Sequence, residues 1–239
     1  MITVNNLTKI FALDKEKVTA LENVSFEVKK EEFFTVIGPS GCGKSTLLRI
    51  IANLDTPTAG KISWEEKPNI GFVFQNFALF PYMSVFENIE LGLKMKGLDK
   101  RKRHQVVKEL IAEIGLEDFK DKHPKELSGG MKQRVGIARA LAIDPNVLLL
   151  DEPFSSLDEF TAETLRMLLL DVWKKRKITI ILITHLIREA LELSDRIVVL
   201  TPAPGTVNKI IVNTLKRPRN LRESEFYALE DELTNLIKI

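Results

Sequence analysis

A glycine-rich loop between two apolar segments is the feature that most constrains this chain of 239 residues. Residues 33–37 predict a buried strand, and residues 47–52 predict a helix that packs on a sheet. The loop between them fits the pattern G-x-x-x-x-G-K-[ST]. Its residues are Gly38, Pro39, Ser40, Gly41, Cys42, Gly43, Lys44, Ser45 and Thr46. In the order strand, loop, helix, the backbone N–H groups of such a loop converge on nucleotide phosphates, and the start of the helix adds partial positive charge.

Two side chains of the loop supply what a phosphate site needs. Lys44 is expected to reach the terminal phosphates, and the Ser45 hydroxyl is expected to hold Mg²⁺. The alternative is a glycine-rich turn that carries a lysine by chance. The strand-like and helix-like flanks argue against that alternative, so the sequence predicts a nucleotide phosphate site.

Charge and composition exclude some kinds of partner. The chain has 35 Lys and Arg against 33 Asp and Glu, which gives no reason to expect nucleic acid or an anionic membrane as the main partner. A single cysteine excludes an internal disulfide and is typical of a reducing compartment. The sequence shows no signal-peptide pattern and no apolar run near 18 residues. We therefore expect a chain that neither crosses a membrane nor carries a classical export signal.

A second element of the same chemistry is an apolar run that ends in two carboxylates. Residues 147–150 predict a central parallel strand, followed by Asp151, Glu152 and Pro153. This run resembles a Walker B element. Asp151 is then expected in the Mg²⁺ shell, and Glu152 is expected to polarise the attacking water as general base. The alternative is a strand followed by two solvated acids.

A third element is a helix start that binds anions but lacks a complete site. Ser128, Gly129 and Gly130 precede a helical apolar pattern, without a lysine or a metal-binding carboxylate of their own. One interpretation is a capped helix without a ligand. The other is that this helix start completes the phosphate site of a second copy across a two-fold axis.

Residues 127–134 resemble the signature motif of ATP-binding cassette (ABC) ATPases, and the resemblance extends from Thr3 to about Arg219. It implies an α/β P-loop NTPase fold, with a RecA/F1-like parallel-sheet core, an antiparallel β subdomain and an α-helical subdomain. It also implies ATP and Mg²⁺ as ligands. The signature residues expected to act on the nucleotide of a second copy are Leu127, Ser128, Gly129, Gly130 and Gln133.

The other motifs of the family can be placed on this sequence. Gln75 matches the Q-loop glutamine, which contacts Mg²⁺ and water, so the expected metal ligands are Ser45, Gln75 and Asp151. His185 matches the switch histidine that reaches the γ-phosphate. The D-loop positions at the dimer interface are Ser156, Leu157 and Asp158.

The same resemblance implies one further contact to the nucleotide, and the sequence differs from the family pattern at two positions. Phe11 matches an aromatic residue that stacks on adenine, although a phenylalanine beside an N-terminal strand is more usually part of a core. Leu186 stands where relatives often have aspartate, and Asn53 stands where many have glycine. Because asparagine tolerates the left-handed conformation, the helix after the phosphate loop can still end there.

The motif order predicts one nucleotide-binding domain over residues 1–239. The expected helical subdomain covers about residues 76–140, and a C-terminal amphipathic helix covers about residues 220–239. The expected antiparallel strands are 2–4, 24–28 and 61–64. The expected parallel strands are 33–37, 72–74, 147–150, 178–183 and 197–200.

Two functions remain open from the sequence. The first is the ATPase subunit of an importer, which dimerises on ATP under an integral-membrane permease at the cytoplasmic face of the membrane and depends indirectly on an extracytoplasmic substrate-binding protein. The patch Phe80, Pro81, Tyr82 and Val85 is then expected to receive the permease. The tail from about residue 200 is similar to that of the nitrate, sulfonate and taurine importers. The second is a soluble ABC ATPase that is not coupled to transport.

Overall fold

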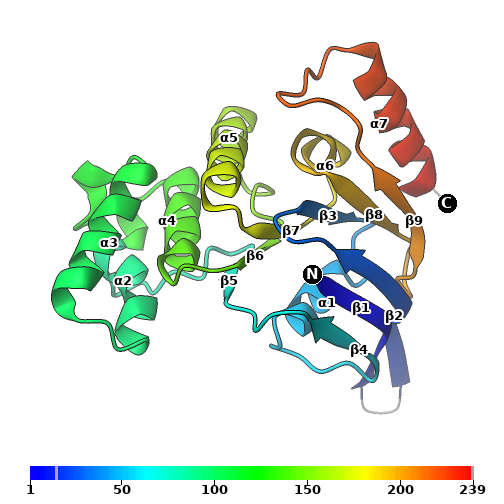
Figure 1. The fold of residues 1–239 in the computed structure, drawn as a ribbon, viewed down its shortest axis with the longest axis horizontal. Coiled ribbons are helices and arrows are strands. Elements are labelled where there is room, and N and C mark those ends of the chain that lie inside the picture. Colours follow the sequence, from blue (N-terminus) through cyan, green and yellow to red (C-terminus); the bar gives the residue numbers. More distant parts are fainter. Residues whose placement is uncertain (14–15, 238–239) are drawn as a thin grey trace. The chain divides into compact units, whose positions relative to one another are not determined.

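The computed structural model describes residues 1–13 and 16–237, and the chain forms two compact units. The first unit comprises residues 1–67 and 179–239, and the second comprises residues 68–178. The first unit contains an antiparallel sheet with the order β2 (Glu16–Val28), β1 (Ile2–Leu13) and β4 (Ala59–Trp64) (Figure 1). The predicted antiparallel subdomain is therefore confirmed, with longer strands than expected.

Four further strands described in the first unit lie side by side, and the phosphate loop follows one of them, β3. Their order is β7 (Thr179–Thr184), β3 (Phe33–Ile37), β8 (Arg196–Leu200) and β9 (Val207–Val212). Strand β3 runs parallel to β7 and β8, and all residues of β3 and β7 are buried, as in a parallel sheet covered on both faces. Strand β9, antiparallel to β8, was not among the expected strands. It is an edge strand with one buried residue, so it lacks the continuous apolar run that marks the others.

Among the described residues of the first unit there are three helices. Helix α1 (Lys44–Ile51) follows the loop, and Asn53 after it has φ +57°, which confirms that asparagine takes the left-handed position. Helix α6 (Ile187–Leu193) and helix α7 (Ser224–Ile237) pack on one another (Figure 1). Helix α7 begins four residues later than expected, and residues 238–239 of the expected helix lie outside the described residues.

The second unit pairs two parallel strands, β5 (Ile70–Val73) and β6 (Val147–Asp151). Strand β5 was expected over residues 72–74, but it ends at Val73 because the chain turns at once: the Phe77 N–H donates to the Phe74 carbonyl. The remaining helices are α2 (Val85–Met95), α3 (Lys100–Glu113), α4 (Gly129–Ala142) and α5 (Glu159–Arg176), with short 3₁₀ turns at Glu117–Phe119 and Pro124–Glu126.

Local signals in the sequence set the starts of these helices. Ser84 and Glu87 form a capping box at α2, in which each side chain accepts a hydrogen bond from the other residue's backbone N–H. Asp99 caps α3 by accepting from the Lys102 N–H. None of the helices in the described part of the chain combines the length and the apolarity needed to cross a membrane.

Candidate functional site

The loop of residues 38–46 is tight on one side and open on the other. Gly43, with φ +95°, caps α1, and a Cβ atom there would lie 2.6 Å from the Ala20 carbonyl oxygen of β2. A Cβ at Gly38 would lie 2.8 Å from the Cys42 sulfur. At Gly41, by contrast, a Cβ would meet nothing within 4 Å. The glycines therefore allow the loop to pack closely on β2 while one side stays open to a ligand.

Lys44 lies inside the loop and not in solvent. Its side chain is 5% exposed, and its ammonium donates to the Gly38 carbonyl at 2.8 Å and to the Pro39 carbonyl at 3.0 Å. Both acceptors are neutral backbone carbonyls of the same loop. A phosphate group bound at the loop can replace these carbonyl contacts with stronger charge-assisted ones.

The pairing of β3 with β7 brings His185 to the edge that carries the loop. Ile37 pairs with Thr184 in the parallel register, so Gly38 and His185 leave neighbouring strands at the same edge. The His185 side chain is exposed. In open α/β sheets, ligands bind at the carboxyl ends of the strands. The predicted switch histidine and the predicted phosphate loop thus share one edge.

Phe11 lies on the hairpin that touches the phosphate loop. Strands β1 and β2 pair Phe11 with Val18, two residues before the Ala20 carbonyl that contacts the loop at Gly43. The Phe11 ring is 36% exposed, so the interpretation that it is a core residue is wrong. The Lys9 ammonium lies 4.8 Å from the ring centroid. An exposed ring at this place is available for stacking.

In the second unit, the carboxyl ends of β5 and β6 bring Gln75 and Asp151 to one edge. Val73 pairs with Leu150, so the residues that follow lie side by side. Gln75 is exposed, and Asp151 is 9% exposed at the last position of β6. Glu152 follows with φ +43°, an uncommon backbone conformation for a residue other than glycine. Such strain concentrates at functional positions, because the surroundings must hold it.

The predicted D-loop segment connects Glu152 to helix α5 through local hydrogen bonds. The Ser155 hydroxyl donates to the Glu152 carbonyl at 3.0 Å. Asp158 caps α5 by accepting from the Thr161 N–H at 3.0 Å, and hydrogen bonding from Thr161 lowers the pKa of the Asp158 carboxyl. Ser156 is exposed and Leu157 is half-buried. Asp158 therefore has a structural role within its own chain, in addition to its predicted place at the dimer interface.

The signature residues divide into surface and interior positions. Ser128 is exposed and caps α4, since its hydroxyl oxygen accepts from the Met131 N–H. Gly130 is required by packing, because a Cβ there would lie 2.3 Å from the Thr161 methyl carbon. Leu127 and Gln133 are buried. Of the five predicted signature residues, Ser128 and Gly129 thus offer atoms at the surface.

Sequence reasoning missed Arg139. This residue of α4 donates from its guanidinium to the Phe77 carbonyl at 3.1 Å and to the Ala78 carbonyl at 2.6 Å, two and three residues after the predicted Q-loop glutamine. Burial lowers the pKa of Arg139. The available signal was an arginine inside the otherwise apolar run of residues 137–142.

A groove beside the Q-loop matches part of the predicted docking patch. Its volume is about 420 Å³, and its lining includes Phe72, Phe74, Phe80, Leu91, Met95 and Arg139. Phe80 is 47% exposed and Tyr82 is 93% exposed, as the prediction requires. Val85 was wrongly included in the patch, because it begins α2 and its side chain is buried among the helices.

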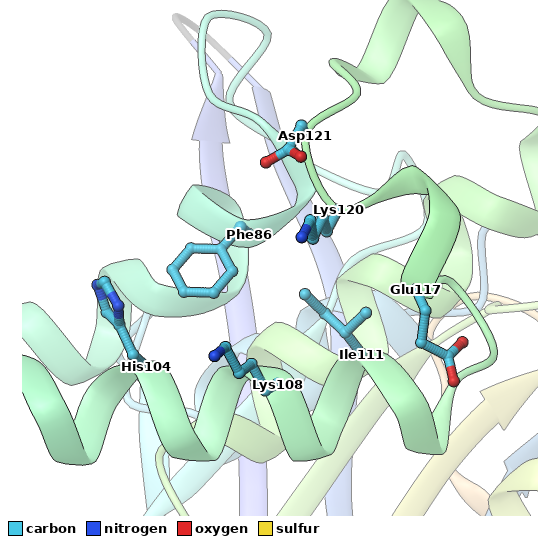
Figure 2. A pocket seen from close by; sticks show the side chains of 7 residues that line it. All are labelled: Phe86, His104, Lys108, Ile111, Glu117, Lys120 and Asp121. Carbon is cyan, nitrogen blue, oxygen red and sulfur yellow. The ribbon is translucent and has the colours of Figure 1, made fainter.

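A separate pocket of about 430 Å³ lies between α2, α3 and the segment after α3 (Figure 2). The rings of Phe86 and His104 meet edge to face in it, with centroids 5.1 Å apart. Its lining residues are Phe86, His104, Lys108, Ile111, Glu117, Lys120 and Asp121. None of them was predicted to bind the nucleotide, so this pocket is not part of the candidate site.

Comparison with known proteins decides the family. Residues 21–155 match the model of the family described as ABC transporter. The chain belongs to the ABC transporter family. Among its relatives, the aliphatic sulfonates import ATP-binding protein SsuB of Bacillus thuringiensis subsp. konkukian is 46% identical, covering 97% of this chain and 94% of the relative. The nitrate import ATP-binding protein NrtD of a Synechocystis species is 40% identical, covering 99% and 95%.

Solved ABC structures support the fold. The dimeric structure of a post-hydrolysis state of the ATP-binding cassette MJ0796, bound to ADP and Pi, has a TM-score of 0.81 and 35% sequence identity. It covers 89% of this chain and 99% of its own. The predicted P-loop NTPase fold of this ABC chain is confirmed, and ATP hydrolysis is the activity expected of it.

Proposed function

We propose that this chain is the ATP-binding and ATP-hydrolysing subunit of an ABC importer. The observation that carries the proposal is the loop of residues 38–46, with Lys44 held by the Gly38 and Pro39 carbonyls at the edge where His185 also lies. The names of the relatives support transport over the alternative of a soluble ABC ATPase, because those proteins are described as import subunits.

The three residues proposed to hold Mg²⁺ fit that ion chemically. Ser45 offers a hydroxyl, Gln75 an amide oxygen and Asp151 a carboxylate, and Mg²⁺ prefers such oxygen ligands. Gln75 and Asp151 follow paired strands, and Ser45 is the second residue of α1. When bound, Mg²⁺ would neutralise charge on the phosphates of ATP.

Glu152 is proposed to act as the general base of hydrolysis. Its carboxylate would take a proton from water while the water oxygen bonds to the γ-phosphorus and the bond to the bridging oxygen of ADP breaks. Lys44 would bind the phosphate oxygens through charge-assisted hydrogen bonds, and His185 would contact the γ-phosphate. Phe11 would stack on adenine, and the exposure of its ring supports this role.

A second copy of the chain is the proposed partner for catalysis. Ser128 and Gly129 lie at the exposed start of α4. Such a helix start attracts anions, and a head-to-tail dimer would place it against the γ-phosphate of the other copy. The dimeric ABC structures with similar folds support this arrangement.

A membrane permease is the proposed docking partner. The groove beside the Q-loop, with Phe80 and Tyr82 exposed next to it, has the apolar and aromatic character that receives an amphipathic helix. The chain would then lie on the cytoplasmic face of the membrane. Nucleic acid is not among its proposed partners. An extracytoplasmic binding protein would deliver the cargo. Small anions such as nitrate or sulfonates are the cargo class that the names of the relatives suggest.

Co-purification with a co-expressed candidate permease tests the proposal. The Phe80→Ala and Tyr82→Ala double variant should lose the permease while still binding ATP, because aromatic anchors of this kind cost about 2 kcal/mol or more when truncated, or about thirtyfold in affinity. Val85→Ala does not serve as a control, since Val85 is buried. A double variant that still assembles and transports at the wild-type rate would contradict the docking role.

A further inference from the structure

The predicted Q-loop glutamine lies in a tight turn with a strained exit. The Phe77 N–H donates to the Phe74 carbonyl at 3.1 Å, so Gln75 and Asn76 are the central residues of the turn. Phe77 and Ala78, which follow, both have positive φ, at +57° and +47°. Two successive non-glycine residues in the left-handed region are unfavourable, and they persist only where neighbouring groups hold them.

Arg139 of α4 stabilises these two residues by hydrogen bonds. Its guanidinium donates to the carbonyls of the same two strained residues, at 3.1 Å for Phe77 and 2.6 Å for Ala78. A guanidinium is planar and presents several N–H donors in a fixed fork, so it fits two adjacent carbonyls in a way that an ammonium cannot. Arg139 lies on α4, the helix that Ser128 caps.

The same side chain also lines the groove beside the Q-loop. Arg139, Phe74 and Ala78 all contribute to its wall, together with the exposed Phe80. Phe80 is held in turn by Asn88 of α2, whose side chain accepts from the Phe80 N–H and donates to the Phe80 carbonyl. A partner in the groove would therefore contact the side chain that holds the turn.

We infer that Arg139 is a positioning residue: it holds the Q-loop turn in its strained form and transmits contacts in the groove to Gln75. The inference rests on the proposed function, because it gives Gln75 a role in hydrolysis. Without the fork, the turn relaxes out of the left-handed conformation and Gln75 moves. Arg139 thereby links three parts of the second unit, namely the groove, the Q-loop and the signature helix.

Arg139→Lys tests the role, because lysine keeps the charge but loses the fork. Hydrogen exchange should be at least about tenfold faster in residues 74–80 of the isolated chain without nucleotide. In the same variant, kcat for ATP should fall about tenfold while KM changes less than twofold. Arg139→Gln should give the same exchange result without leaving an ammonium in a partly buried position.

Arg134→Lys is the matched control. Arg134 lies on the same helix and also donates to a carbonyl, that of Ile114, at 3.3 Å, but it does not contact the Q-loop. Its replacement should leave exchange in residues 74–80 unchanged. Ala78→Gly added to Arg139→Lys should restore most of the lost protection and kcat, because glycine adopts positive φ without strain.

The outcomes separate this inference from the proposed function. The inference is overturned if residues 74–80 exchange at the wild-type rate in both Arg139→Lys and Arg139→Gln. It is also overturned if Ala78→Gly fails to restore protection to Arg139→Lys while the single and the double variant are both folded. If the wild-type chain neither binds nor hydrolyses ATP, the proposed function fails, yet the exchange experiment still measures whether Arg139 holds the turn. Faster exchange with glycine rescue in a chain that hydrolyses ATP supports both.

Discussion

The Thr184 hydroxyl donates a hydrogen bond of 2.5 Å to the Glu189 carboxylate, and both side chains are buried beside His185. The same hydroxyl oxygen accepts from the Leu186 N–H at 3.1 Å, so it fixes the backbone on both sides of His185. Leu186 is the N-cap residue of α6 and gives it no side-chain cap, since leucine has no acceptor. Thr184, held by Glu189, therefore orders the backbone at the position that precedes α6.

Thr184→Val should therefore impair hydrolysis more than ATP binding. Valine keeps the shape but removes the hydroxyl, so we expect a roughly tenfold lower kcat with little change in ATP affinity. Thr184→Ser keeps the hydroxyl and serves as the control, expected to stay near wild type. Adding Thr184→Val to His185→Ala should cause little further loss if the hydroxyl acts through the imidazole. Additive losses in that double variant would argue against this role.

Glu152→Gln and Lys44→Ala should separate catalysis from binding. Removing a general base costs on the order of 10²–10⁴ in rate, so Glu152→Gln should bind ATP but hydrolyse it slowly. Lys44→Ala removes the ammonium that the Gly38 and Pro39 carbonyls hold in the loop, so it should lose ATP. Filter retention of labelled ATP measures both. Equal loss of binding in the two variants would contradict this division of roles.

ATP should draw two chains together, most visibly in Glu152→Gln, where hydrolysis does not end the complex. Size-exclusion chromatography with light scattering should show a dimer with ATP and Mg²⁺ and a monomer without them. Ser128→Arg places a large side chain at the exposed start of α4 and should abolish the dimer. Lys132→Arg on the same helix, which keeps the charge, is the control. A dimer that survives Ser128→Arg would argue against a shared site.

Phe226→Ala should destabilise the first unit. Phe226 and Leu233 of α7 are buried in a cluster with Ala190 and Leu191 of α6. Truncating a buried phenylalanine costs about 3–5 kcal/mol through lost apolar burial and the cavity left behind. Tyr227→Ala, at a position 48% exposed on the same helix, should cost much less. Chemical denaturation measures the difference, and equal midpoints would show that α7 contributes little to stability.

Sequence patterns predicted the elements that depend on neighbouring residues. The run of residues 33–37, the glycine loop and the left-handed Asn53 each follow from local composition, and the structure has all three. The prediction was less accurate where contacts between distant residues determine burial or strand pairing. Val85 lies close in sequence to the exposed Phe80 and Tyr82, but its own side chain is buried at the start of α2. Strand β9 forms because it pairs with β8, and no local pattern in the sequence predicts that pairing.

The sequence by itself determined the family, the phosphate loop and the order of the motifs, because spacing along the chain encodes them. Tertiary structure alone decided which side chains hold the motifs in place. Parallel pairing of Ile37 with Thr184 brings His185 to the edge of the loop, although these residues are far apart in the chain. Arg139 reaches Phe77 from 62 residues away and Ala78 from 61. Such contacts depend on the packing of helices and strands, and a hydrogen bond between distant residues leaves no periodic pattern in the sequence.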